Sequence, residues 1–306
     1  MLVQLGGIFL NVVTPVFALL LIGALAGRWL ELDTRTLTRF AYFLLTPAFV
    51  FNIIGKADVS AALALRMIGF IAVVEIGLAL LGFLVARLLR RPRKLVGAYI
   101  LIAVFGNVGN FGLPLIEFRL GPDALIPATV FFVSVSMIAF TIGVAVATGS
   151  QGSKLNALFS VIKTPAIIAL PFALFFNATG GPPLFLERIA GLLGAAMVPT
   201  MLVTLGVQLS QMKNFHFSAD MFIASGVRLL GGPLLGGPLL AFLLVIPFGL
   251  VGLERGAGIL QASVPSAALA SIIALEHDLL PDFVTPTVLL STLLSLVTLT
   301  GLMVVI

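Results

Sequence analysis

The chain has 306 residues, of which 60% are hydrophobic and only 9% are charged, and its formal net charge is +5. A soluble domain carries roughly 25% charged residues, so this composition excludes a water-soluble protein and predicts that apolar side chains face lipid. The chain contains two histidines, His216 and His277, and no cysteine, which removes disulfides, zinc clusters and thiolate chemistry. We therefore expect no catalytic residue, no metal site and no cofactor.

Ten apolar segments follow one another along the chain, each bounded by charged or turn-forming residues. Because a membrane-spanning helix needs about 20 apolar residues, these segments predict ten transmembrane helices with no soluble domain between them. The first segment is too long for the core of a signal peptide, so we expect it to be retained. The predicted spans are 6–28, 37–55, 63–87, 95–119, 123–147, 156–178, 188–210, 219–247, 256–277 and 283–305.

The lysines and arginines near the ends of these spans predict the orientation in the membrane. With the N-terminus outside, the inside loops hold twelve of them and the outside loops five, so both termini are expected outside. The cluster at 87–94 then faces the cytoplasm, where an orientation signal near lipid headgroups explains it better than a nucleic-acid partner. The twelve are Arg28, Arg35, Arg39, Arg87, Arg90, Arg91, Arg93, Lys94, Lys154, Lys163, Lys213 and Arg228; the five are Lys56, Arg66, Arg119, Arg188 and Arg255.

Glu75 is the only acidic residue deep within an apolar segment. It lies about 12 residues from either end of the third span, roughly 18 Å at a rise of 1.5 Å per residue. A charge at that depth costs at least about 2.5–3.5 kcal/mol unless it is paired, neutralised or hydrated. We expect Glu75 to face the protein interior as a proton site or an ion-pair partner. The alternative is a protonated residue that only fills space.

The fourth span is interrupted by three glycines, two asparagines and a proline within residues 106–114. Glycine costs about 1 kcal/mol and interior proline about 3 kcal/mol relative to alanine, so a break in the helix is expected. The second half of a broken helix starts with unpaired N–H groups and a partial positive charge, which suits an anion. Pro114 suits the first turn of that half, and Asn107 and Asn110 share one face if the turn is helical. Alternatively, the asparagines only cap freed backbone groups, or the small residues serve close helix packing.

An internal repeat relates the two halves of the chain. Identical residues recur 159 positions apart without a gap, and prolines and an aspartate keep the register. Five spans per half is an odd number, so the second half enters the membrane from the opposite side and the repeats are inverted. The expected repeats are 1–147 and 156–306, joined by the polar stretch from Thr148 to Asn156. The matching pairs are Gly97 and Gly256, Ala98 and Ala257, Leu101 and Leu260, Pro122 and Pro281, Asp123 and Asp282, Pro127 and Pro286, Ser136 and Ser295, and Thr141 and Thr300.

The repeat makes the eighth span equivalent to the third and places Arg228 near the counterpart of Glu75. Arg228 lies about a third of the way into its span from the cytoplasmic side. One interpretation is that it reaches toward Glu75 or toward a substrate carboxylate, which makes both residues candidates for ion coupling. The other is that its long side chain extends to the lipid headgroups.

The ninth span carries an interruption at the matching depth, because Pro265 aligns with Gly106 in the repeat. Ser266 and Ala267 are expected to open its second half, and Gln261 and Ser263 to complete the substrate site from before the break. Paired interruptions at equivalent positions of two halves are the best sequence indication of a transport site.

These residues resemble the auxin efflux carrier family, which includes plant auxin exporters and bacterial carriers of small dicarboxylates. The resemblance implies that spans four and nine cross where they unwind. It implies a scaffold of spans 1, 2, 6 and 7 that holds a homodimer, a moving unit of spans 3–5 and 8–10, and a substrate-facing Asn107. The chain departs from the family in having His277 where a tyrosine is common, and in its short loop. The matching segments are GNVGNFGLP at 106–114, TPAIIA at 164–169, VPTMLVTLG at 198–206, QASVP at 261–265, ALE at 274–276 and LSTLLSL at 290–296.

The leading interpretation is an elevator-type secondary transporter of small organic anions, such as dicarboxylates or auxin-like acids, in a plasma membrane of the bacterial inner-membrane type. No nucleotide-binding motif is present, so ATP is not the energy source within this chain. A sodium-coupled symporter of the bile-acid type is the nearest alternative. A membrane enzyme would need a cluster of titratable groups at one depth, which the sequence lacks. No sequence feature distinguishes a channel or a sensor from a transporter, so these alternatives stay open. The expected partners are the organic anion and membrane lipid, not nucleic acid.

Overall fold

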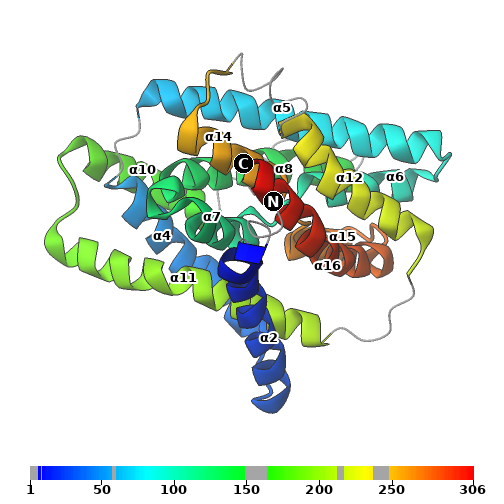
Figure 1. Cartoon of the computed structure of the whole chain (residues 1–306), viewed down its shortest axis with the longest axis horizontal. Helices are drawn as coiled ribbons and strands as arrows, with labels where there is room; N and C mark the ends of the chain where they lie inside the picture. The colour runs from blue at the N-terminus through cyan, green and yellow to red at the C-terminus, as the bar shows by residue number, and fades with distance from the viewer. Residues whose placement is uncertain (1–5, 8, 57–59, 149–163, 212–216, 237–247) are drawn as a thin grey trace.

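A computed structural model of the chain confirms the predicted all-helical fold. It describes residues 6–7, 9–56, 60–148, 164–211, 217–236 and 248–306, and all the regular elements within them are helices (Figure 1). The predicted junction between the repeats lies outside the described residues beyond Thr148. The elements are η1 (Phe9–Val13), α2 (Thr14–Trp29), α3 (Thr34–Phe40), η2 (Ala41–Leu45), α4 (Thr46–Ile54), α5 (Ala61–Leu88), α6 (Arg93–Val104), η3 (Val108–Gly112), α7 (Leu113–Leu120), η4 (Pro122–Ala124), α8 (Leu125–Thr148), α10 (Pro165–Ala178), α11 (Leu184–Gln211), α12 (Ala219–Gly236), α14 (Gly252–Ala262), α15 (Ala268–Glu276) and α16 (Pro281–Val305).

Six helical segments of the described residues are long and apolar enough to cross a membrane. The other four predicted spans correspond to shorter helices, because two are interrupted and two continue into residues outside those described. Ten spans in inverted repeats therefore stay a prediction, whereas the length and composition of these six segments are consistent with a multi-pass membrane protein. The six segments are Phe9–Trp29, Thr34–Ile54, Ala61–Leu88, Pro122–Gly143, Leu184–Gln211 and Pro281–Val305.

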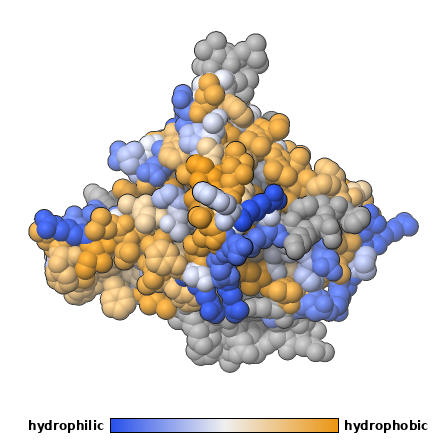
Figure 2. Space-filling model, turned by 90° about the horizontal axis from the view of Figure 1, so that it is seen from below, coloured by the Kyte–Doolittle hydropathy of each residue, from blue (hydrophilic) through white to orange (hydrophobic). Residues whose placement is uncertain are grey.

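The outer surface matches a lipid environment. Large apolar side chains that a soluble protein would bury are exposed along the helices, for example Leu65 on α5 at 73%, Leu192 on α11 at 78% and Val297 on α16 at 76%. Apolar residues cover much of the face in Figure 2, and hydrophilic residues gather there in separate patches. Contiguous apolar surface of this extent marks contact with lipid or with another protein.

Helices α2 and α11 cross in Figure 1 and pack closely against each other, because glycines bring their backbones together. A Cβ atom on Gly206 of α11 would lie 2.0 Å from the Leu20 carbonyl oxygen of α2. A Cβ on Gly23 of α2 would lie 2.2 Å from the Val203 carbonyl oxygen of α11. Helix α4 packs against both α10 and α11, so these four helices form one packed group.

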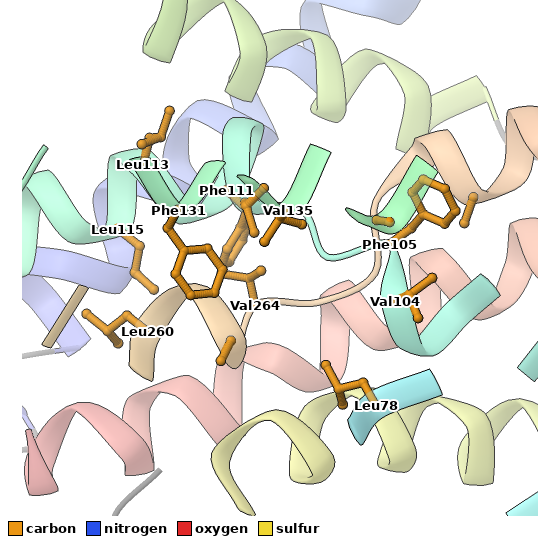
Figure 3. Packing of buried hydrophobic residues seen from close by; sticks show 14 of the residues in the cluster. Leu78, Val104, Phe105, Phe111, Leu113, Leu115, Phe131, Val135, Leu260 and Val264 are labelled. Carbon is orange, nitrogen blue, oxygen red and sulfur yellow. The ribbon is translucent and has the colours of Figure 1, made fainter. Parts of the chain in front are cut away.

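The remaining helices enclose the broken ones. Helix α5 packs along α6, α8 and α12, and α12 also packs along α16. Buried side chains from the broken helices α6, η3–α7 and α14 meet those of α8 and α5 in one apolar core, seen around Phe105, Phe111 and Val264 in Figure 3. This core surrounds the place where the helices are interrupted.

Candidate functional site

The two interruptions predicted in the sequence face each other in the structure. Helix α6 ends at Val104 and helical structure resumes at Val108, while α14 ends at Ala262 and α15 begins at Ala268. The two connections run antiparallel, paired at Gly106 and Ser266, and pass each other in Figure 3.

Two backbone hydrogen bonds join these connections. The Asn107 N–H donates to the Pro265 carbonyl at 2.7 Å, and the Ala267 N–H donates to the Phe105 carbonyl at 2.6 Å. Four helix ends therefore meet inside the protein: the C-terminal ends of α6 and α14, and the N-terminal ends of η3–α7 and α15.

The fourth-span break is shorter than the sequence predicts, because a π-helical turn takes up much of it. Only residues 105–107 are non-helical, and η3 runs from Val108 directly into α7. Pro114 lies in the first turn of α7, as expected, although the continuous helical segment already begins at Val108. Asn107 precedes this turn with a non-helical backbone, so the three-residue spacing to Asn110 does not by itself place both amides on one face. The shared face was expected only if the turn from Asn107 to Asn110 is helical, and the backbone of Asn107 does not meet that condition.

The side chains of Asn107 and Asn110 form no hydrogen bond in the part of the chain that the structure describes. Asn107 is 4% exposed and Asn110 is partly buried, yet no hydrogen bond among the described residues uses either amide. In particular, Asn107 occupies the N-cap position of η3 without a side-chain capping bond. The alternative that the asparagines cap freed backbone groups therefore finds no support in the described contacts. Two amides with free donors stand at the start of a helix.

The polar residues of the ninth span hold the crossing together. The Ser266 hydroxyl donates to the Ile102 carbonyl at 2.8 Å, and the Ser263 hydroxyl donates to Ile259 of its own helix at 2.7 Å. Pro265 is buried and supplies the carbonyl that accepts from Asn107. The two serine hydroxyls already donate hydrogen bonds and Pro265 has no N–H to donate, which separates these residues from the asparagines.

Gln261 spans the space between the two broken helices. Its Nε2 donates to the Ala128 carbonyl at 3.3 Å, and its Oε1 is buried without a hydrogen-bond donor in the described residues. Gly112 makes room for it, since a Cβ there would lie 2.1 Å from that oxygen.

Sequence reasoning missed Ser291, which supports the crossing from α16. Its hydroxyl oxygen accepts from the Ser266 N–H at 3.1 Å and its proton goes to the Val288 carbonyl at 2.8 Å. Ser291 is fully buried and lies in the 290–296 segment that matches the family. The polar residues of that segment indicate that it contacts other polar groups in the protein, but nothing in the sequence indicates which of them reaches the ninth span.

Arg228 is the largest fully buried side chain, and it binds the backbone at both breaks. Its Nε donates to the Val264 carbonyl at 2.8 Å, its Nη1 to Ala103 at 2.8 Å and its Nη2 to Gln261 at 3.5 Å. The alternative that Arg228 extends to the lipid headgroups is therefore wrong. The reason is physical: helix ends inside the protein leave carbonyls without partners, and an arginine satisfies several at once.

Glu75 faces the interior, as predicted, with no exposed surface. Both carboxylate oxygens lack a hydrogen-bond partner among the described residues. Arg228 interacts with it electrostatically, but the two form no ion pair within 4.0 Å, because the guanidinium is turned toward the backbone carbonyls. The role of Glu75 as a direct ion-pair partner of Arg228 is thus not realised in this conformation.

Some cations of the 87–94 cluster have partners within the protein. The Arg91 Nε donates to Asp220 at 2.9 Å, and the Tyr99 hydroxyl donates to the same carboxylate oxygen at 2.6 Å. Lys94 pairs with Asp278 at 2.7 Å, and this hydrogen bond and charge lower the pKa of the Asp278 carboxyl. The cluster therefore also ties the loop before α6 to α12 through Arg91, and the first turn of α6 to the turn after α15 through Lys94.

A separate groove lies between α4, α10 and α11 and is not the candidate site. It has a volume of about 350 Å³ and is lined by apolar side chains such as Phe51, Phe172 and Leu193. An organic anion needs hydrogen-bond donors or positive charge, and this groove offers neither. The crossing of the broken helices, in contrast, offers both.

Two broken helices that meet inside an apolar, multi-pass helical protein are typical of secondary transporters. The family model described as "Membrane transport protein" matches residues 8–303, and the chain belongs to this family, which is the auxin efflux carrier-like family that its motifs indicate. It is therefore a membrane transporter. The resemblance drawn from the sequence is confirmed.

Two relatives illustrate the range of the family. A Methanothermobacter thermautotrophicus protein named "Uncharacterized transporter" is 29% identical over 273 residues, which cover 88% of each chain. A Rhizobium meliloti protein named "Putative malonate transporter" is 26% identical over 321 residues, which cover 96% of this chain and 94% of that protein.

Proposed function

We propose that this chain is a secondary transporter that carries small organic anions, dicarboxylates foremost, through the crossing of its two broken helices. The observation that carries this proposal is a pair of side-chain amides at the start of η3–α7, Asn107 and Asn110, which make no hydrogen bond with the described residues. A helix N-terminus presents unpaired N–H groups and a partial positive charge, so amide donors beside it complete a site for a carboxylate. Gln261, Ser263, Pro265 and Ser266 support the wall of that site, and Pro114 fixes the start of α7.

The substrate class follows from the charge of the crossing. Helical segments η3–α7 and α15 both begin at the crossing, and each contributes the partial positive charge of a helix N-terminus. Two such charges suit an anion with two carboxylates. The name of the Rhizobium meliloti relative refers to malonate, a three-carbon dicarboxylate. Malonate is therefore the first compound to test, followed by longer dicarboxylates and indole acids.

The proposed mechanism is alternating access by an elevator motion. The scaffold comprises spans 1, 2, 6 and 7 (α2, α3–α4, α10 and α11), and the moving unit comprises spans 3–5 and 8–10. Support comes from the packing of α2 and α4 with α10 and α11, and from the backbone bonds at the crossing. In these two bonds the donors are Asn107 and Ala267 and the acceptors are Pro265 and Phe105. The two donors are 160 residues apart, and so are the two acceptors, which is within one residue of the 159-residue spacing of the proposed inverted repeats 1–147 and 156–306.

Glu75 is the proposed proton site of the moving unit. It is buried, its oxygens have no hydrogen-bond partner in the described residues, and it lies within the electrostatic influence of Arg228. We place the protein in a bacterial inner membrane with both termini outside, and expect a homodimer through the scaffold.

Isothermal titration of the purified protein with malonate tests the proposed site. The N107A and N110A variants are expected to fold like the wild type and to bind at least about tenfold more weakly, or about 1.4 kcal/mol each. The matched control is N52A, which removes an amide from α4, where the Asn52 oxygen is buried and has no hydrogen-bond partner among the described residues. Undiminished affinity in folded N107A and N110A would refute the assignment, and loss of folding in both would favour a structural role.

A further inference from the structure

Three backbone carbonyls converge where α6 and α14 end. The last carbonyls of a helix have no partner within it and carry a partial negative charge. Ala103 lies in the last turn of α6, Gln261 lies in the last turn of α14, and Val264 lies in the connection that follows. In transporters with broken helices, carbonyls of this kind are the ligands of a coupled alkali cation. Here the Arg228 guanidinium lies among them.

The surroundings are shaped to admit this guanidinium. At Gly106, a Cβ atom would lie 2.1 Å from Nη2 and 2.7 Å from Cζ of Arg228, so any other residue would displace it. Four residues after Arg228, on the same face of α12, Gly232 lets that helix approach the ninth-span break. A Cβ on Gly232 would lie 1.8 Å from the Ala262 carbonyl oxygen. Glycines on both sides therefore allow one planar cation to reach both broken helices.

We infer that Arg228 is a tethered cation that occupies the carbonyl site a free coupling ion would otherwise take, so that this carrier works without sodium. An arginine keeps its charge at any physiological pH, so it neutralises the two negative helix ends permanently. The two positive helix ends, with Asn107 and Asn110, then remain for the substrate anion. Arg228 is a positioning residue in this account: it acts through the backbone it holds. Of the tests below, only the uptake measurements rest on the proposed transport function.

Chemical rescue distinguishes a tethered cation from an ordinary structural contact. The R228A variant empties a guanidinium-sized space lined by three carbonyls. We expect its malonate uptake in proteoliposomes to fall by at least about tenfold. Millimolar guanidinium chloride, far below denaturing concentrations, is expected to restore much of this uptake and to raise the melting temperature of R228A. The wild type and N107A, which keep Arg228, are the controls and should show neither effect.

The sodium requirement is measured on the wild type alone, so it does not depend on how R228A folds. Uptake is expected to change by less than about twofold when sodium is replaced by choline. A larger dependence on sodium would overturn the inference. Full uptake by R228A without guanidinium would also overturn it, and so would a folded R228A that guanidinium neither reactivates nor stabilises.

If R228A does not fold, R228K is used instead. This variant should retain a charge, bind fewer carbonyls and show partial uptake. Full uptake by R228K would contradict the need for a guanidinium. The melting-temperature shift requires no substrate, so a wrong substrate leaves it intact.

Discussion

The substitution of Gly232 by alanine tests whether close approach of α12 to the ninth-span break holds the crossing together. The added Cβ would lie 1.8 Å from the Ala262 carbonyl oxygen, 2.7 Å from its carbon and 3.2 Å from the Ser263 Cα, all backbone atoms that have no rotamer to change. Ordinary contact begins at 3.4 Å, so α12 has to move away by about 1.6 Å.

That displacement breaks the bonds of Arg228, which lies one turn earlier on the same helix. Its two 2.8 Å hydrogen bonds, to Ala103 and Val264, would lengthen to about 4.4 Å, beyond hydrogen-bonding range. Each hydrogen bond to a charged group contributes about 1.5–3 kcal/mol, so losing both costs about 3–6 kcal/mol. At about 2–4 °C per kcal/mol, G232A should melt at least about 6 °C below the wild type.

The matched control is G226A, on the same helix, where the added Cβ meets nothing within 4 Å. Melting temperatures of fluorescent-protein fusions, read by size-exclusion chromatography after heating, make the comparison in detergent. Alanine is the better helix former by about 1 kcal/mol, so G226A should match or slightly exceed the wild type. If G232A melts within about one degree of G226A, α12 does not hold the break through Arg228 and the geometric reasoning is refuted.

Three further predictions concern other parts of the molecule. E75Q removes the deep titratable group, so its uptake should lose the pH dependence of the wild type; an unchanged rate and pH profile would exclude a proton role. G206A forces α2 and α11 apart and should lower the melting temperature by about 3 °C or more, whereas G191A on the same helix, with its nearest atom 3.8 Å away, should not. The pKa of Asp278 is lowered by Lys94, so their ion pair stabilises the fold at neutral pH and loses its effect as the pH falls through that lowered value. The melting temperature of D278N should therefore lie slightly below that of the wild type at neutral pH and equal it in acid. A difference in melting temperature that persists in acid would contradict this account.

The sequence predicted the breaks because their cause is local. Glycine, asparagine and proline at 106–114 cannot form an undisturbed helix, and the register of the repeat places Pro265 at the same depth. It also predicted that Glu75 faces inward, since an unpaired, dehydrated charge at that depth in lipid is costly whatever packs around the helix. These features need no knowledge of what packs against them.

The parts that the sequence did not predict depend on contacts between distant segments. A long cationic side chain can reach lipid headgroups or a buried partner, and only the fold brings the carbonyls of α6 and α14 within reach of Arg228. The π-helical turn after Asn107 shortened the expected break, and no residue pattern distinguishes it from an unwound segment. Nothing in the sequence distinguishes Gly232 from the other glycines of its span, and only the fold shows its close approach to Ala262.

Counterflow of radiolabelled malonate into proteoliposomes is the most direct test that the crossing of the broken helices is the transport site. We predict saturable uptake that unlabelled malonate inside the vesicles accelerates, independent of sodium, and reduced at least about tenfold in N107A and N110A but not in N52A. Counterflow that proceeds at the wild-type rate in both asparagine variants would contradict the account.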